Sequence, residues 1–123
     1  MVSFKVSDLK MMNESLKEFS DFLRRASVAE EDIFASRLVS CELISNVIIH
    51  SGKSAEFCGE LDGGGIVITV TASGFENVDL SPSLPDVFAE SGRGMYIVNC
   101  LSGGNVQRSE DGLKVFIKRS EIK

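Results

Sequence analysis

Apolar residues recur at helical spacing over the first part of the chain. Steps of three and four residues place them on one helix face, and they are Leu9, Met12, Leu16, Phe19 and Leu23. This stripe predicts an amphipathic helix that begins after a cap at Ser7 or Asp8 and ends near Ala26. Ser27 and Glu30 have the spacing of a capping box, which predicts the start of a second helix there.

The second predicted helix combines core residues with a regular row of polar ones, and Ser51–Gly52 is expected to end it. Its expected core residues are Ile33, Phe34, Leu38, Cys41, Leu43, Ile44, Val47, Ile48 and Ile49. Glu42, Asn46 and His50 recur every four residues, and each such step turns a helix by about 40°. A carboxylate, an amide oxygen and an imidazole in one row suit a metal–phosphate site, although a solvated helix face gives the same spacing.

Period-two alternation predicts most of the remaining chain as strands. The five predicted strands are Val2–Val6, Ala55–Leu61, Ile66–Thr71, Val106–Ser109 and Leu113–Arg119. Turns at 62–65 and 110–112 contain glycine and join four of these strands into two hairpins. A third helix is expected at Met95–Leu101, after a stretch (73–91) with two prolines that we expect to be a mobile surface segment.

The order of these elements predicts the fold class. One strand, two helices, a hairpin, a helix and a second hairpin give the order β-α-α-β-β-α-β-β. We expect an α+β two-layer sandwich in which helices cover one face of a mixed, mainly antiparallel sheet. With 123 residues and no linker or repeat, the chain is expected to form a single domain over residues 1–123.

Composition narrows the expected partners and environment. A net charge of −5 argues against a nucleic-acid or anionic-membrane surface. No apolar run approaches the length that spans a bilayer, and the N-terminus lacks an apolar signal segment. Cys41, Cys58 and Cys100 are odd in number and scattered in apolar sequence, so we interpret them as reduced core thiols of a cytoplasmic protein.

A second motif, at residues 91–98, places two glycines at the start of the third predicted helix. Gly92 and Gly94 let the backbone approach a ligand closely, and the first N–H groups of a helix can bind an anion. Arg93 between them adds a fixed positive charge. A plain tight turn is the more common explanation of a lone G-x-G, so the motif becomes informative only together with the row of polar residues on the second helix.

The two motifs resemble those of the GHKL (Bergerat-fold) ATPase superfamily, and within it the small anti-sigma-factor serine-protein kinases. The helix motif E-x-x-x-N-x-x-x-H of that family matches Glu42, Asn46 and His50, and its G-R-G-L/M motif matches residues 92–95. The order of elements in the family agrees with nearly the whole chain. The resemblance implies a histidine-kinase-like ATPase fold that uses ATP and Mg²⁺.

The resemblance also implies a role for each matching residue. Asn46 would offer its amide oxygen to Mg²⁺, and Glu42 would be the catalytic residue that orients or deprotonates the attacking hydroxyl. The residues implied in nucleotide binding are Asn46, His50, Gly74, Gly92, Arg93, Gly94 and Met95. The reaction would be phosphoryl transfer to a serine of a partner protein, driven by positioning and charge neutralisation. The implied partners are an anti-sigma-factor antagonist, a sigma factor or both, and a homodimer is a further option.

Three positions depart from the family pattern near the site where the family reads adenine, and two of them carry the polar groups that read it. The family motif D-x-G-x-G-F aligns with residues 70–75, so Val70 replaces the aspartate and Ala72 replaces the first glycine, whereas Gly74 fits. The G-T pair in the last hairpin of the family aligns with Gly112–Leu113. Both polar groups that would read the adenine are therefore apolar in this chain.

Two functions follow from these motifs, and the sequence favours the first. The first function is that of a regulatory switch domain that binds protein partners and makes weak or no use of ATP, because Val70 and Leu113 are apolar. The alternative is an active serine-protein kinase that phosphorylates an anti-sigma-factor antagonist and regulates transcription. A displaced alignment, with Glu76 or Asp79 reading the adenine, would favour the kinase. The catalytic domain of a sensor histidine kinase fits less well, because only 16 residues lie between Phe75 and Gly92, which is short for the lid of that family.

Overall fold

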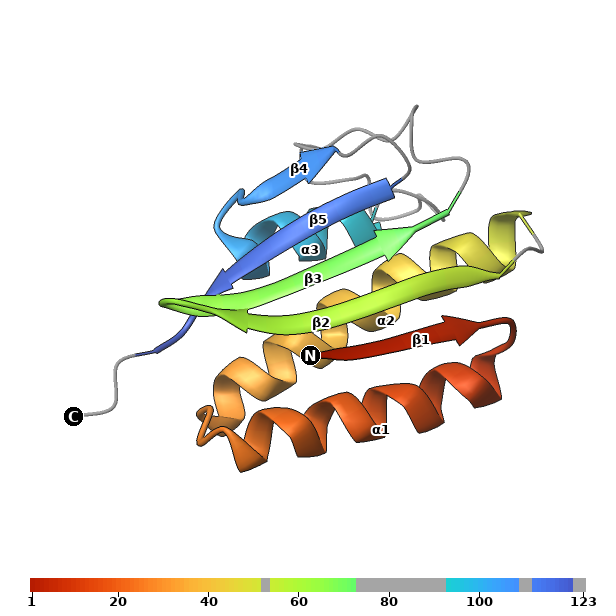
Figure 1. Ribbon diagram of the computed structural model, residues 1–123. Helices are drawn as coiled ribbons and strands as arrows, with labels where there is room; N and C mark the ends of the chain where they lie inside the picture. Colours follow the sequence, from red (N-terminus) through yellow and green to blue (C-terminus); the bar gives the residue numbers. More distant parts are fainter. Residues whose placement is uncertain (52–53, 73–92, 109–111, 121–123) are drawn as a thin grey trace.

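The computed structural model describes residues 1–51, 54–72, 93–108 and 112–120, and within them it shows one sheet and three helices (Figure 1). The elements in chain order are β1 (Val2–Val6), α1 (Leu9–Arg25), α2 (Glu30–Ser51), β2 (Ala55–Asp62), β3 (Gly65–Thr71), α3 (Arg93–Ser102), β4 (Val106–Arg108) and β5 (Gly112–Lys118). This is the predicted order, and the bounds of the elements differ from the predicted ones by a few residues at most. The stretch expected to be mobile, 73–91, lies outside the described residues.

The sheet has five strands in the order β1-β2-β3-β5-β4, and all four pairings are antiparallel. The helices lie together on one of its faces, as Figure 1 shows. The predicted α+β two-layer architecture is therefore confirmed. The sheet is antiparallel throughout the described strands, because hairpins join β2 to β3 and β4 to β5 and leave no parallel crossover.

The core lies between this sheet and the helices. Alternate residues of the central strands point into it and are buried: Phe57 on β2, Ile66, Ile68 and Val70 on β3, and Leu113, Val115 and Ile117 on β5. The predicted stripe of α1 covers them from Met12 onward, and the rings of Phe19 and Phe57 meet edge to face with centroids 5.1 Å apart. This layer fixes α1 and α2 above the sheet.

The cap and the end of α1 follow from local hydrogen bonds. The Asp8 carboxylate accepts a hydrogen bond from the Met11 N–H at 2.8 Å, which satisfies one free donor of the first turn. Ser27 is not the cap of α2 that the sequence predicts. It has a φ of 62° and follows α1, and the next N–H, that of Val28, donates to the Leu23 carbonyl oxygen. This is the left-handed termination of a helix, which glycine usually provides.

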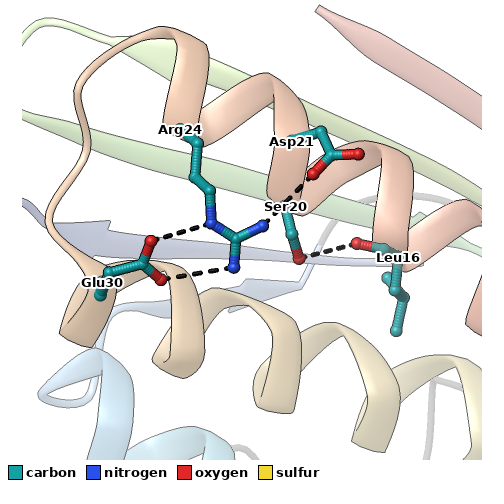
Figure 2. Close-up of polar contacts among 5 residues, drawn as sticks. All are labelled: Leu16, Ser20, Asp21, Arg24 and Glu30. Atoms are coloured by element: carbon teal, nitrogen blue, oxygen red, sulfur yellow. Dashed lines mark hydrogen bonds and ion pairs between the residues drawn. The ribbon is translucent and has the colours of Figure 1, made fainter.

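Polar contacts hold the junction between α1 and α2. The Arg24 guanidinium donates to both Glu30 carboxylate oxygens, at 2.8 and 3.3 Å, and to Asp21 at 3.2 Å (Figure 2). Glu30 is therefore engaged with α1 and does not form the predicted capping box with Ser27. The Ser20 hydroxyl donates to the Leu16 carbonyl oxygen one turn earlier in α1, so this buried polar side chain is satisfied.

Three residues that were expected in the core are exposed. Phe34 and Ile49 on α2 are 67% and 65% exposed, and Leu9 in the first turn of α1 is 45% exposed. The buried face of α2 is centred on Leu43, and both Phe34 and Ile49 fall on the opposite side of the helix at 100° per residue. Among the described residues, no helix combines the length and apolar character needed to cross a membrane.

Candidate functional site

The site predicted from the two motifs is where the middle of α2 meets the start of α3. A side-chain carbon built at Gly94 would lie 2.7 Å from Glu42 Oε2 and 3.4 Å from Asn46 Nδ2. Positions 46 and 94 are far apart in the sequence, so their contact is a product of the fold. The polar row of α2 and the glycine motif at the start of α3 therefore meet in the folded chain.

The packing of α3 explains this close approach. Met95, Val98 and Ser102 of α3 are buried, at three- and four-residue spacing, so one side of the helix is fixed in the core. Gly94 precedes this buried set and turns toward the polar row of α2, where Glu42 and Asn46 are half-buried. Any larger residue at 94 would have to displace the Glu42 carboxylate, so glycine is the residue that fits.

The groups at this contact suit an anion together with a divalent cation. The first turn of α3 has N–H groups without partners inside the helix and the positive end of the helix dipole, which favour phosphate. Asn46 Nδ2 lies 3.4 Å from a side-chain carbon built at Gly94, and the oxygen of the same amide is a group that can coordinate a cation. No cluster of three or more histidine, cysteine or acidic residues occurs in the described part of the chain. A site with the single amide oxygen of Asn46 beside a phosphate-binding helix start fits Mg²⁺, because Mg²⁺ is held by one or two protein oxygens together with phosphate oxygens and water.

For the remaining predicted site residues, the structure shows the element that carries them or does not describe them. His50 continues the row on α2, and Arg93 is the first residue of α3. Gly74 and Gly92 lie outside the described residues. Met95 is 7% exposed and belongs to the core cluster. The structure thus brings together Glu42, Asn46 and the start of α3, which is the phosphate half of the predicted site.

The two residues at the predicted base-reading positions are apolar and buried. Val70 on β3 and Leu113 on β5 are direct cross-strand partners, and both are 0% exposed. They share one core cluster with Met95, and Ala72 packs against that cluster. A side chain at Gly112 would overlap the Val70 carbonyl oxygen, so the end of β5 lies tightly against β3. No polar side chain therefore replaces the missing aspartate and threonine at these two positions.

A protein-family model described as "Histidine kinase-like ATPase domain" matches residues 6–118. The chain belongs to this family. The match spans every element that builds the site, from the last residue of β1 to the end of β5. No curated protein matches the chain closely enough to count as a relative. Membership implies ATP and Mg²⁺ as the general ligands of the family, and Asn46, Glu42 and the α3 N-terminus are the described residues that would hold the phosphate end.

The three cysteines are free thiols, as expected. The expectation that they are buried in the core is wrong. Cys41 and Cys58 are half-buried, and Cys100 is exposed because it lies on the outer side of α3. Burial is the main cause that raises the pKa of the Cys41 and Cys58 thiols. A hydrogen bond with Cys100 raises the pKa of the Tyr96 phenol. Cys41 and Cys58 therefore remain protonated near neutral pH, which is unlike the thiolate of a catalytic cysteine.

Sequence reasoning missed one polar cluster far from this site. The Asp32 carboxylate, 6% exposed, accepts hydrogen bonds from the N–H and the hydroxyl of Ser120, at 2.7 and 2.8 Å. The Arg119 guanidinium donates to the carbonyl oxygens of Ala26 and Ser27, at 3.5 and 3.3 Å. These contacts tie the chain after β5 to the start of α2. An acidic residue in the first turn of a helix has a local explanation, so no sequence signal pointed to Ser120.

Proposed function

We propose that this histidine kinase-like ATPase domain is a regulatory switch domain that works through protein partners and retains only the phosphate half of its nucleotide site. One observation carries the proposal: Val70 and Leu113 face each other across β3 and β5 with no exposed surface. Purine recognition needs hydrogen-bonding groups at the base, and these two side chains offer none. The Glu42–Asn46–Gly94 contact still provides groups for phosphate and Mg²⁺.

The binding free energy that a hydrogen bond to adenine contributes is large enough to distinguish a site that selects adenine from one that binds nucleotides weakly. A hydrogen bond from the adenine amino group to a carboxylate contributes about 1.5–3 kcal/mol. Its loss weakens binding by about 10- to 150-fold, because each 1.4 kcal/mol corresponds to a factor of ten. A triphosphate held only through its phosphates would bind with little regard for the base. The domain would then respond weakly to ATP and act mainly through its surfaces.

The proposed partners follow from the resemblance to anti-sigma-factor serine-protein kinases. They are an antagonist protein of the anti-sigma-factor type, a sigma factor, or both. Purified candidates of each class, titrated with the chain by calorimetry, test this part of the proposal. Saturable binding by one class supports it, and the absence of binding by both classes would contradict it.

A second function is favoured by the intact contact between α2 and α3. In an active serine-protein kinase, Glu42 would accept the proton of the attacking serine hydroxyl, and Asn46 would orient the cation at the phosphates. The first turn of α3 would neutralise charge on the transferred phosphoryl group. ATP with Mg²⁺ supplies that group when it is bound. Glu42 Oε2 lies 2.7 Å from a side-chain carbon built at Gly94, which places the carboxylate beside the start of α3.

Calorimetric titration with Mg²⁺–ATP and Mg²⁺–GTP separates the two functions. The switch domain should bind both nucleotides weakly and with equal affinity, and Asn46→Ala should weaken both because it removes the cation ligand. Glu42→Gln serves as the second variant, since it keeps the shape of the side chain at Gly94. Tight, adenine-selective binding by the unmodified chain would overturn the proposal and favour the kinase.

A further inference from the structure

The face of the sheet opposite the helices carries a buried valine. Val67 lies between Ile66 and Ile68, which both point into the core, so its side chain points to the opposite, outer face. It is nevertheless only 4% exposed, and it does not belong to the core cluster. The described helices lie together on the inner face (Figure 1), so side chains of the sheet itself cover Val67.

The ring of Phe116 provides part of this cover. Phe116 is the direct cross-strand partner of Val67, so both side chains are on the outer face. A side-chain carbon built at Gly65 would overlap the Phe116 ring, which shows that the ring lies over the backbone of Gly65. The glycine therefore allows the ring to lie flat against the sheet, where it forms an apolar floor together with Val67.

This floor belongs to a hollow of about 260 Å³ on the outer face, which we call the outer hollow. It crosses four neighbouring strands, and its lining residues are Asp62 on β2, Val67 on β3, Lys114 and Phe116 on β5, Gln107 on β4 and Asn105 directly before β4. The apolar floor is thus edged by one carboxylate, one ammonium group and two amides. Sites for drug-sized ligands have volumes of about 300–1,000 Å³, so the outer hollow suits a smaller molecule.

The two charged groups of the outer hollow do not neutralise each other. Asp62 and Lys114 are exposed, and neither forms an ion pair or a side-chain hydrogen bond with another described residue. The strand register explains this, because Asp62 is opposite Gly65 of β3 and Lys114 is opposite Thr69, four residues further along. Two strand spacings and four residues place their Cα atoms about 16 Å apart. A carboxylate and an ammonium group therefore lie at opposite ends of an apolar floor.

This separation indicates the class of ligand that complements the charges. In a free amino acid the ammonium and the carboxylate are bonded to the same carbon, so they are poorly placed to reach both ends. A dipeptide separates them by one further residue, about 3.8 Å, and adds a peptide group between them. The amides of Gln107 and Asn105 can bind that group. Asn105 already donates from Nδ2 to the Ser102 carbonyl oxygen at 2.9 Å, so its amide oxygen remains as the acceptor.

We propose that the outer hollow binds apolar dipeptides with free termini, with the ammonium at Asp62, the carboxylate at Lys114 and the side chains on the apolar floor. Burial of the apolar side chains provides affinity, and the two charge-assisted contacts select the zwitterion. Leu113 and Lys114 are adjacent on β5 and point to opposite faces of the sheet, so the outer hollow is separate from the nucleotide site. Binding needs no nucleotide, so it goes beyond the proposed function and does not depend on it.

An NMR titration of the isotope-labelled full chain with leucyl-leucine tests the proposal. Saturable amide shifts are expected at Val67, Lys114 and Phe116, with a dissociation constant of about 0.1–1 mM for a ligand of this size. N-acetyl-leucyl-leucine lacks the ammonium and leucyl-leucinamide lacks the carboxylate, so each should bind about threefold to tenfold more weakly. Shifts that do not saturate by about 10 mM overturn the proposal, as do equal affinities for the free and the capped dipeptides.

Two variants test which terminus meets which side chain. Lys114→Gln should weaken leucyl-leucine about threefold to tenfold and leave leucyl-leucinamide unchanged, because that ligand has no carboxylate to lose. Asp62→Asn should weaken leucyl-leucine and leave the N-acetyl form unchanged. The matched controls are Lys118→Gln and Glu56→Gln, which change a charge on the same strands and the same face but outside the lining. Equal losses in the controls and the lining variants overturn the proposal, because net charge would then account for binding.

The same spectra test whether a second copy of the chain occupies the outer hollow instead. The proposal predicts that amide shifts at Val67 and Phe116 stay constant when the protein alone is diluted tenfold. Shifts that change on dilution and are unaffected by leucyl-leucine overturn the proposal in favour of a contact between copies. The spectrum of each variant also establishes that it is folded.

Discussion

Val70 and Leu113 lie directly opposite each other in the pairing of β3 with β5, and neither side chain has exposed surface. The two positions at which the family has its polar adenine-reading groups are therefore one physical unit. An aspartate at position 70 alone, or a threonine at position 113 alone, would be buried without its polar partner, at a cost of about 1–3 kcal/mol or more. Replacement of both by apolar residues removes that cost. The pairing explains why the two substitutions occur together in this chain.

Restoring both polar residues should create a preference for adenine. We expect the Val70→Asp/Ala72→Gly/Leu113→Thr variant to bind ATP about 10- to 150-fold more tightly relative to GTP than the wild-type chain does, which corresponds to about 1.5–3 kcal/mol. The reason is that the restored carboxylate and hydroxyl would accept and share the hydrogen bonds of the adenine amino group. Calorimetry with both nucleotides measures the ratio.

The single Val70→Asp variant is the control for cooperation between the two positions. Its carboxylate replaces a fully buried side chain opposite Leu113, so the free energy of unfolding should fall by about 3 kcal/mol or more. Urea unfolding measures this loss, and the triple variant should recover part of it. If the single variant is as stable and as adenine-selective as the triple variant, the two positions do not act as a unit.

A second prediction concerns the contact between α2 and α3. In Gly94→Ala, the added carbon would lie 2.7 Å from Glu42 Oε2, so the carboxylate must move. Alanine also favours a helix by about 1 kcal/mol over glycine, which offsets the cost of the displacement. We expect the free energy of unfolding to change by less than about 1 kcal/mol, and the affinity for Mg²⁺–triphosphate to fall by about tenfold.

Gly64→Ala is the matched control for this substitution. Gly64 lies in the β2–β3 turn, outside α2 and α3, and no atom lies within 4 Å of a side-chain carbon built there. It should leave triphosphate binding unchanged in the same calorimetric titration. Equal affinities of Gly94→Ala and the wild-type chain would show that the position of Glu42 does not matter for the phosphates.

The fold and half of the site could be predicted because their signals are local. The alternation in β2 and the three- and four-residue spacing in α1 report which residues face the core, since both elements have one buried face. The four-residue spacing of Glu42 and Asn46 predicts that both lie on one face of a helix. The order of elements in the family then predicts that Gly94 lies beside that face. Only coordinates could show that the Glu42 carboxylate fills the space at Gly94.

The failures arise where one helix has more than one apolar side. In α2, Phe34 and Ile49 are as apolar as Leu43, so composition alone assigned all three to the core. Angular position separates them, because Leu43 is buried and the other two lie on the opposite side. The Asp32–Ser120 contact joins residues 88 positions apart and has no periodic signal, so the sequence gives no indication of it.

A third prediction concerns pH and the junction of α1 with α2. Hydrogen bonding from Arg24 is the main cause that lowers the pKa of the Glu30 carboxyl below its usual 4.5. A lowered folded-state pKa stabilises the fold at pH values above the unfolded-state value, and this contribution is lost as the pH falls through the folded-state value. Glu30→Gln should therefore lower the thermal midpoint slightly at neutral pH, and the difference from the wild-type chain should vanish well below pH 4.5.

The control for this pH dependence is Glu31→Gln. Glu31 shares the first turn of α2 and its dipole, whereas the Arg24 guanidinium donates to Glu30 and Asp21. High salt should reduce the effect of Glu30→Gln, because the pair is exposed and screened. Identical pH profiles for the two variants would show that the helix dipole, and not Arg24, accounts for the contribution of Glu30.

A fourth prediction concerns the contact that ties the chain after β5 to α2. The Asp32 carboxylate is buried and accepts two hydrogen bonds from Ser120, so Asp32→Ala should lower the free energy of unfolding by about 2–3 kcal/mol. Ser120→Ala removes only the hydroxyl donor and should cost about 1 kcal/mol, since the backbone N–H remains bonded. Urea unfolding of both variants and of Glu31→Ala, an exposed acidic residue in the same turn, measures these losses.

The double variant decides whether the two losses come from one contact. If Asp32 and Ser120 act through the hydrogen bonds between them, Asp32→Ala/Ser120→Ala should cost less than the sum of the single variants, by about 1 kcal/mol. In Asp32→Ala, the Ser120 hydroxyl has already lost its acceptor, so its removal should have little further effect. Strictly additive losses would mean that Asp32 stabilises the fold through the first turn of α2 alone, where a carboxylate interacts favourably with the helix dipole.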